Sequence, residues 1–201
     1  MAAYRKGILT TVLAGVLLSA CGGDQPPPIT EQPTASQEKP AATVAPPAGS
    51  TLRAIARMEP KSGSSVSGAV VFTAFDGPMV MGGVLSGGEP GTHAIHIHEV
   101  GDCSAADGTS AGPHFNPTGA PHGRPDSPDG QHHAGDLGNI TFDANGRAGF
   151  DRVLGTGLTF RGDTGIVGRA VIVHAKPDDF ETQPTGAAGA RIACGVIELL
   201  E

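Results

Sequence analysis

Several things are scarce in this sequence of 201 residues. It has no tryptophan, one tyrosine and only 4% aromatic residues, so its core must be built from Val, Ile, Leu, Ala and a few Phe side chains. No long segment shows the apolar period of an amphipathic helix, which argues against a helical bundle. No basic patch argues for nucleic acid, and the formal net charge is −7.

The chain also lacks a run suited to spanning a bilayer, because the apolar stretch Gly7–Leu18 is too short. It follows Arg5 and Lys6. A basic start, an apolar centre and small residues before a cleavage site predict a secretory signal over residues 1–20. Leu18-Ser-Ala-Cys21 resembles the lipobox of bacterial lipoproteins, in which the cysteine is lipidated. An ordinary signal peptide with an incidental cysteine is the alternative.

Residues 22–50 are rich in Pro, Ala, Thr, Gln and Ser and have almost no large apolar side chains. Such a segment cannot bury enough surface to offset its ordering entropy. We therefore expect residues 21–50 to form a flexible tether, held on a membrane by lipid at Cys21. Residues 51–201 fit a single domain. Loss of the signal removes two positive charges and leaves a net charge of −9.

Only three cysteines are present. With Cys21 assigned to lipid, Cys103 and Cys194 remain, and in an exported protein we expect them to form a disulfide. In the chain-entropy model the long loop that they close is worth about 4–5 kcal/mol.

Short runs of β-branched or alternating apolar residues predict eight strands separated by Gly, Pro and Asn-Gly turns, and hence an antiparallel sandwich or barrel. The runs are Leu52–Met58, Val66–Ala74, Met79–Leu85, Thr92–His98, Asn139–Asp143, Arg147–Leu154, Ala170–His174 and Ile192–Leu199. Residues 99–135 contain no plausible strand, and a loop of that length is usually functional or disordered. A second irregular stretch covers residues 176–190.

Histidine is concentrated in the first of these loops and in the strand before it. Seven of the eight histidines fall in four short segments, and the eighth, His174, ends a predicted strand. Together with Asp136 they supply enough ligands for two metal ions. His96 and His98 are two apart on a strand, so their side chains emerge on one face. The alternative for that pair is a polar strand face with two surface histidines.

Six segments, in order, resemble copper/zinc superoxide dismutase. They are His96-Ile-His98-Glu-Val-Gly-Asp, Ser110-Ala-Gly-Pro-His114-Phe-Asn-Pro117, His122-Gly, His133-Ala-Gly-Asp136-Leu-Gly-Asn139, Gly168-Arg-Ala-Val-Ile-Val-His174 and Ala188-Gly-Ala-Arg191-Ile-Ala-Cys194-Gly-Val-Ile. The resemblance covers essentially all of residues 51–201. The spacing around Cys103 and the short second loop are more similar to the bacterial exported branch. The resemblance implies an all-β, eight-stranded Greek-key β-barrel, an immunoglobulin-like sandwich with two long functional loops.

The resemblance also implies two metal sites. The implied copper ligands are His96, His98, His114 and His174, and the implied zinc ligands are His114, His122, His133 and Asp136. His114 would then bridge both ions as an imidazolate. Four imidazoles suit a redox-cycling copper ion, and three imidazoles with a carboxylate suit a structural zinc ion.

Further residues acquire roles from the same resemblance. Arg191 would guide the anion, because its guanidinium is always charged; a surface salt bridge is the alternative. Asp178 would link a copper-ligand imidazole to a zinc-ligand imidazole, and Thr185 would narrow the channel. We expect His93 and His132 to be structural.

The predicted function is dismutation of superoxide to O₂ and H₂O₂ by alternate reduction and reoxidation of copper, with His114 passing a proton. It would act in the cell envelope, anchored through lipid, with superoxide as substrate; a homodimer is left open. Within the second loop, residues 180–189 have Glu181 as their only charge, and a negative chain opposes a negative substrate. Alternatives are a non-enzymatic envelope copper/zinc-binding protein on the same scaffold and an adhesion module. The adhesion module gives no reason for seven metal ligands.

Overall fold

The computed structural model describes residues 51–74, 78–128, 130–154 and 157–200. The predicted signal, the tether and Cys21 lie outside the described residues. Eight strands form the fold: β1 (Leu52–Pro60), β2 (Ser67–Ala74), β3 (Met79–Ser86), β4 (Gly91–His98), β5 (Asp136–Phe142), β6 (Arg147–Val153), β7 (Ala170–His174) and β8 (Arg191–Leu200). No helix among the described residues is long and apolar enough to cross a membrane.

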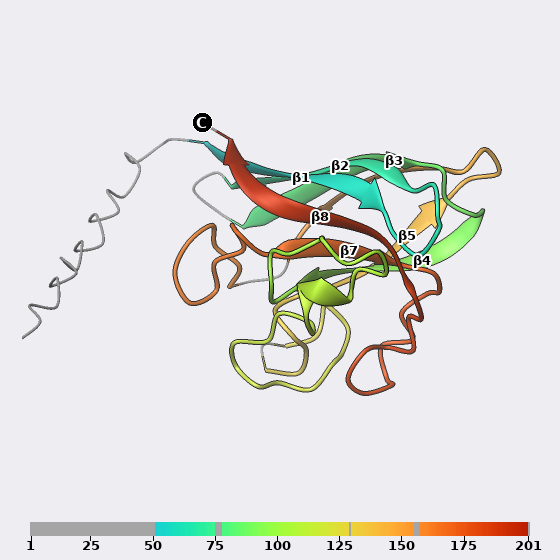
Figure 1. Ribbon diagram of the computed structural model, residues 1–201. Coiled ribbons are helices and arrows are strands. Elements are labelled where there is room, and N and C mark those ends of the chain that lie inside the picture. The colour runs from blue at the N-terminus through green and yellow to red at the C-terminus, as the bar shows by residue number, and fades with distance from the viewer. Residues whose placement is uncertain (1–50, 75–77, 129, 155–156, 201) are drawn as a thin grey trace, which may run out of the picture. The chain divides into compact units, whose positions relative to one another are not determined.

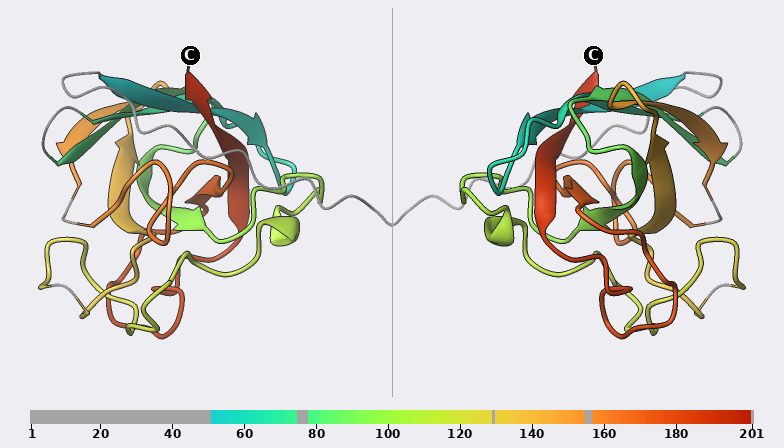
Figure 2. Two further views of the ribbon diagram at one scale, coloured as in Figure 1. Left: turned by 90° about the vertical axis from the view of Figure 1, so that its left-hand side faces the viewer. Right: turned by 90° about the vertical axis from the view of Figure 1, so that its right-hand side faces the viewer.

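The strands form one antiparallel sheet in the order β5-β4-β7-β8-β1-β2-β3-β6, which curls into a nearly closed barrel (Figures 1 and 2). The pairs β4–β7 and β8–β1 join strands that are distant in the sequence, as a Greek key requires. The predicted fold class is therefore confirmed. Most strand boundaries lie within two residues of the prediction. The largest difference is that β5 begins at Asp136 and not at Asn139, because Asp136 pairs with His96 beyond a bulge in β4.

A single arginine closes the seam between the two ends of the sheet order. The strands β5 and β6 are joined by the tight turn that begins at Asp143, but they do not pair with each other in the sheet order. Arg152 on β6 crosses the seam and donates to the carbonyl oxygens of Leu137 (2.8 Å) and Asn139 (2.6 Å) on β5. A side chain thus takes the place of a backbone ladder, which the pattern of apolar residues did not predict.

The barrel interior is aliphatic, as the composition predicts. Its largest fully buried apolar side chains are Phe72, Phe142, Met81, Leu85, Ile95, Ile97, Leu137, Ile166 and Ile197. Each such side chain contributes about 1.5–3 kcal/mol by leaving water. In β4 the core residues Ile95 and Ile97 alternate with His96 and His98, and all four are buried. The period of two therefore turns both histidines away from the core.

Two long loops, residues 99–135 and 175–190, lie on the same side of the barrel (Figures 1 and 2). Among its described residues, the first loop contains one short 3₁₀ helix, η1 (Thr109–Ala111), as its only helix. A disulfide between Cys103 and Cys194 ties this loop to β8, with a Cα–Cα distance of 5.7 Å. The predicted pairing is confirmed. Because His96 and His98 face away from the barrel core, it is these loops that bury their side chains.

Candidate metal centre

Three imidazoles of the first predicted group stand on barrel strands. His96 and His98 lie on β4, and β4 pairs with β7, which ends at His174. The ring centroids of His96 and His174 are 4.9 Å apart, and all three side chains are buried. The barrel alone therefore brings these three histidines together.

The fourth imidazole comes from the first loop, which runs alongside the end of β4. His114 forms an isolated β-bridge with His98, and the next residue, Phe115, donates its backbone N–H to the carbonyl of Ile97 at 2.8 Å. The ring of His114 lies 4.1 Å from that of His96, centroid to centroid. The loop is thus held in a strand-like path where it delivers this histidine.

Hydrogen bonds fix which nitrogen of each strand histidine is free. His96 donates from Nε2 to Asp178 Oδ2 (2.7 Å), His98 donates from Nδ1 to the carbonyl of Gly112 (2.8 Å), and His174 donates from Nδ1 to the carbonyl of Gly189 (3.3 Å). Because a neutral imidazole has one donor and one acceptor nitrogen, the opposite nitrogen carries a lone pair.

Those free nitrogens converge. His96 Nδ1, His98 Nε2, His114 Nε2 and His174 Nε2 are buried without a hydrogen-bond partner among the described residues. Their residues form a group whose ligand atoms all lie within 4.8 Å of one another. Buried polar atoms without partners are costly, and four converging lone pairs fit a bound copper ion.

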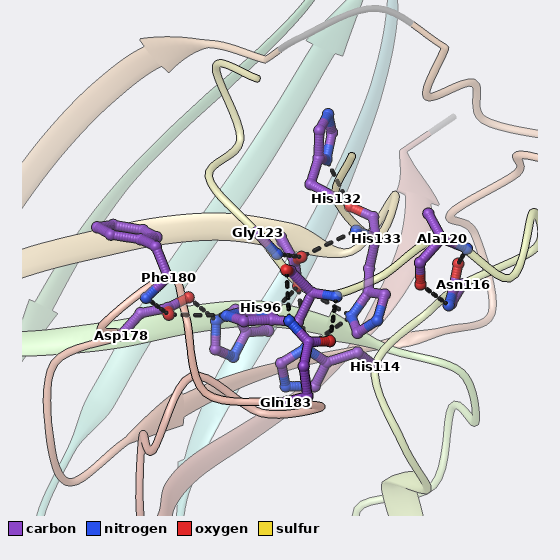
Figure 3. Close-up of polar contacts among 12 residues, drawn as sticks. His96, His114, Asn116, Ala120, Gly123, His132, His133, Asp178, Phe180 and Gln183 are labelled. Carbon is purple, nitrogen blue, oxygen red and sulfur yellow. Dashed lines mark hydrogen bonds and ion pairs between the residues drawn. The ribbon is translucent and has the colours of Figure 1, made fainter. Parts of the chain in front are cut away.

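The second group surrounds one carboxylate oxygen. Asp136 Oδ1 lies 3.0 Å from Nδ1 of His114, 3.0 Å from Nδ1 of His122 and 3.3 Å from Nδ1 of His133. In a tetrahedral zinc site with bonds of about 2.0 Å, ligand atoms lie about 3.3 Å apart. The other oxygen, Asp136 Oδ2, accepts backbone N–H bonds from Gly123 (3.0 Å) and His133 (2.9 Å). The four side chains therefore fit zinc. Figure 3 labels two of them, His114 and His133.

Asp178 joins the two groups from the second loop. Its carboxylate accepts from His96 Nε2 at 2.7 Å and from His122 Nε2 at 2.8 Å, one bond on each oxygen. Figure 3 shows Asp178 beside His96 and away from His133. A carboxylate in this position orients both rings and raises the basicity of their other nitrogens. The link predicted for Asp178 is thus present in the geometry.

The imidazoles of the first group are poor bases toward protons. Burial lowers the pKa of His174 to about 3, helped by the neighbouring His96, and burial lowers the pKa of His114 to about 4 despite its hydrogen bond with Asp136. Burial and the proximity of His114 also hold the pKa of His98 well below its usual value. All three rings are therefore neutral at pH 7, with lone pairs available to a metal.

His122, in the second group, behaves in the opposite way. Burial by itself would lower the pKa of His122, but contacts with the carboxylates of Asp136 and Asp178 outweigh it and raise this pKa to about 9. Burial would raise the pKa of Asp136 and of Asp178, yet their bonds with the histidines hold both pKa values below the usual range. At pH 7 a protonated His122 therefore lies between the ionised carboxylates of Asp136 and Asp178, so a metal must displace a proton.

Arg191, at the start of β8, lies at the edge of the first group. Its guanidinium donates to the carbonyl oxygens of Gly108 and Gly112, both at 2.7 Å. The Gly112 carbonyl also accepts from His98, so one oxygen connects Arg191 to a predicted copper ligand. The arginine is partly exposed and forms no salt bridge among the described residues, which removes the alternative interpretation for that part of the chain.

A comparison with protein families decides the relationship. The model of the copper/zinc superoxide dismutase family matches residues 66–197, which is most of the chain. This chain belongs to the copper/zinc superoxide dismutase family. Copper and zinc are the metals of this family, and the two buried groups fit them.

Among solved structures, the crystal structure of the clock protein EA4 is similar to this dismutase-family chain. The TM-score is 0.67 and the sequence identity is 38%, over 78% of this chain and 98% of that chain. That protein is described as a clock protein, so the shared fold does not by itself decide the activity.

Three predicted residues lie apart from the two groups. His93 is buried and lies within hydrogen-bond distance of the carbonyls of His174 (2.8 Å) and Glu89 (3.0 Å), which fits a structural role. His132 turns its Nδ1 to the carbonyl of His133, and Figure 3 shows its ring pointing away from the other labelled histidines. Thr185 is exposed on the second loop.

Sequence reasoning missed the side-chain amides that hold the loops. Asn139 on β5 pairs with both backbone groups of Asp178, donating to its carbonyl at 3.0 Å and accepting its N–H at 2.8 Å. Gln183 pairs in the same way with His122. No spacing in a sequence marks an Asn or Gln whose side chain holds a loop backbone. The partners of Asn139 and Gln183 also lie 39 and 61 residues away, so the sequence contains no signal for either role.

Proposed function

We propose that this chain is an exported superoxide dismutase whose copper ligands are His96, His98, His114 and His174 and whose zinc ligands are His114, His122, His133 and Asp136. The observation that carries the proposal is that His114 belongs to both buried groups, with Nε2 in the first and Nδ1 in the second. A shared imidazole ties the copper position to a second metal, which holds the ring in place.

The reaction consumes two superoxide ions and two protons and releases O₂ and H₂O₂. Copper held by the first group would supply the one-electron couple for both halves. Arg191 would bind the anion electrostatically, while Gly108 and Gly112 orient its guanidinium. His114 would hold a proton at Nε2 and deliver it to the second superoxide, because its Nδ1 is engaged on the zinc side. Thr185, on the exposed second loop, would limit the size of the anion that reaches this point.

For location, we propose export through the signal over residues 1–20 and lipidation at Cys21, with residues 21–50 as tether and residues 51–201 as the enzymatic domain. The Cys103–Cys194 disulfide supports an oxidising compartment. Labelling cells with a radioactive fatty acid would test the anchor: we expect label on the wild-type chain and none on Cys21→Ala.

The second candidate is a non-enzymatic copper/zinc-binding protein, favoured by the similarity to a protein described by a clock role. The test is superoxide loss catalysed by the chain loaded with copper and zinc, with metal content measured on the same sample. The enzyme should approach about 10⁸–10⁹ M⁻¹s⁻¹. Activity no higher than that of free copper, with both metals bound, would favour the second candidate.

Arg191→Ala separates the same two candidates. In the enzyme, loss of the local positive charge should slow turnover about 10-fold or more and leave both metals bound. In a metal-binding protein the substitution should change nothing that is measured. Arg57→Ala is a matched control, because Arg57 is exposed on β1 and pairs with Glu198 away from the two groups.

A further inference from the structure

The side chain of Gln183, in the second loop, hydrogen-bonds to both backbone groups of His122 in the first loop. Its Oε1 accepts the His122 N–H at 2.7 Å, and its Nε2 donates to the His122 carbonyl at 2.8 Å. Figure 3 shows Gln183 reaching toward the histidine cluster from this loop. Two bonds in opposite directions fix both the position and the orientation of one peptide segment.

The segment that Gln183 holds is positioned by side chains and not by bonds to other backbone groups. Among the described residues, no backbone–backbone hydrogen bond involves residues 120–123. Side chains take over instead: Asn116 pairs with both backbone groups of Ala120, Asp136 accepts from Gly123, and Gln183 holds His122. Backbone groups of a covered segment need partners, so these side chains determine where the segment lies.

Gln183 is itself presented by an ordered turn. The carboxylate of Asp179 accepts the backbone N–H groups of Glu181 (2.9 Å) and Thr182 (2.8 Å), and Thr182 accepts from Gly186 at 2.7 Å. The backbone of Gly186, near the end of this turn, packs closely against the site, because a Cβ there would clash with Asp178 Oδ1 and lie 2.6 Å from His122 Nε2. The turn therefore places the amide at a defined distance from the His122 backbone.

We propose that Gln183 is a positioning residue for the zinc site: through the His122 backbone it sets where His122 Nδ1 meets His114, His133 and Asp136. This rests on the zinc site of the proposed function. The His122 ring is already held by Asp178 at Nε2, so the amide adds the second point that stops the ring from swinging about that bond. Copper ligands are not held by Gln183, and Asp178 is anchored separately by Asn139.

The test compares Gln183→Met, which removes both bonds at nearly constant side-chain length, with Gln183→Glu, which keeps the acceptor and loses the donor. Gln131→Met is the matched control, because Gln131 is exposed on the first loop and its side chain has no hydrogen bond among the described residues. The measurements on the full chain are zinc and copper affinity by chelator competition, the absorption bands of cobalt(II) placed in the zinc site, and urea unfolding of the metal-free chain.

We expect Gln183→Met to weaken zinc binding about 10-fold, the low end for residues behind a metal ligand. The cobalt bands should shift, Gln183→Glu should fall between wild type and Gln183→Met, and copper affinity and metal-free stability should stay unchanged. Zinc affinity equal to that of Gln131→Met would overturn the proposal, as would parallel loss of zinc, copper and stability. A wild-type chain that binds neither zinc nor cobalt would overturn the zinc site itself, and that result is distinct because it appears before any substitution.

Discussion

The two metal-binding groups share His114 but are built in different ways. The copper group takes three of its four histidines from β4 and β7, where the sheet ladder fixes the backbone. The zinc group takes His122 and His133 from the first loop, and only Asp136 stands on a strand. The backbone hydrogen bonds of a sheet already position the side chains of its strands, whereas residues of a loop need hydrogen bonds from individual side chains to hold them in place. The zinc group therefore depends more than the copper group on single side chains: Gln183 holds only His122, and Asp178 contacts one residue of each group.

We expect the largest effect from removal of the disulfide that anchors the first loop beside the copper group. The Cys103–Cys194 disulfide spans 91 residues and anchors the part of the loop that offers Gly108 and Gly112 to Arg191. Replacing both cysteines with serine should lower the free energy of unfolding of the metal-free chain by about 4–5 kcal/mol. Urea unfolding measures this loss against the oxidised wild type, and reduced wild type should show the same loss as the variant. A loss below about 1 kcal/mol would mean that noncovalent contacts hold this part of the loop.

Next comes Asp178, which touches both halves. Asp178→Ala should weaken zinc binding about 10- to 100-fold and copper binding less, because His98 and His174 keep their carbonyl partners. Chelator competition at pH 7 measures both affinities, and Asp126→Ala, at an exposed aspartate paired only with Arg124, serves as the control. An equal loss of zinc and copper affinity would contradict the expectation that the copper group, built mainly on strands, depends less on Asp178 than the zinc group.

The two halves should also differ in their response to pH. The raised pKa of His122, about 9, means that zinc must displace a proton, so zinc affinity should rise about tenfold per pH unit from pH 7 to 9. The pKa values of His174 and His114, about 3 and 4, lie far below pH 7, so the copper affinity of the zinc-free chain should be nearly flat there. Isothermal titration in buffers of different ionisation enthalpy would count the released protons. No proton released with zinc at pH 7 would refute this expectation.

The same shifts predict the stability of the metal-free chain. The raised pKa of His122 gives a contribution that is present below about pH 6.5 and is lost as pH rises through about 9. The lowered pKa values of His114 and His174 give contributions that are present above about pH 6.5 and are lost as pH falls toward about 4 and 3. Denaturation across pH 4–9 should therefore show losses at both ends.

The smallest effect concerns the strand that carries Asp136. Arg152→Met should cost about 1–1.5 kcal/mol of stability, because Arg152 is only partly buried and water can replace its bonds to Leu137 and Asn139. Zinc affinity should fall more than copper affinity, since β5 also carries Asn139. Arg147→Met is the control, because Arg147 is exposed on the same strand. A loss confined to copper would contradict the assignment of β5 to the zinc half.

The strands were predictable because alternation of buried and exposed residues is a local property. All eight were located from their apolar runs, and the boundary that differed most, at Asp136, fails the pattern because Asp136-Leu-Gly is neither β-branched nor alternating. The ligand types were also visible, since histidines at these spacings resemble one family. The disulfide followed from the number of cysteines available, and its geometry agrees.

By itself, the sequence therefore determined the all-β class, the strand positions and the residues able to bind metal, because these depend on side-chain chemistry and a period of two. Only the tertiary structure decided which nitrogen of each histidine is free and why His122 is basic while His174 is not. It also decided which amides hold the loops. Each of these depends on contacts between residues tens of positions apart, such as Gln183 with His122, and on the burial that such contacts create.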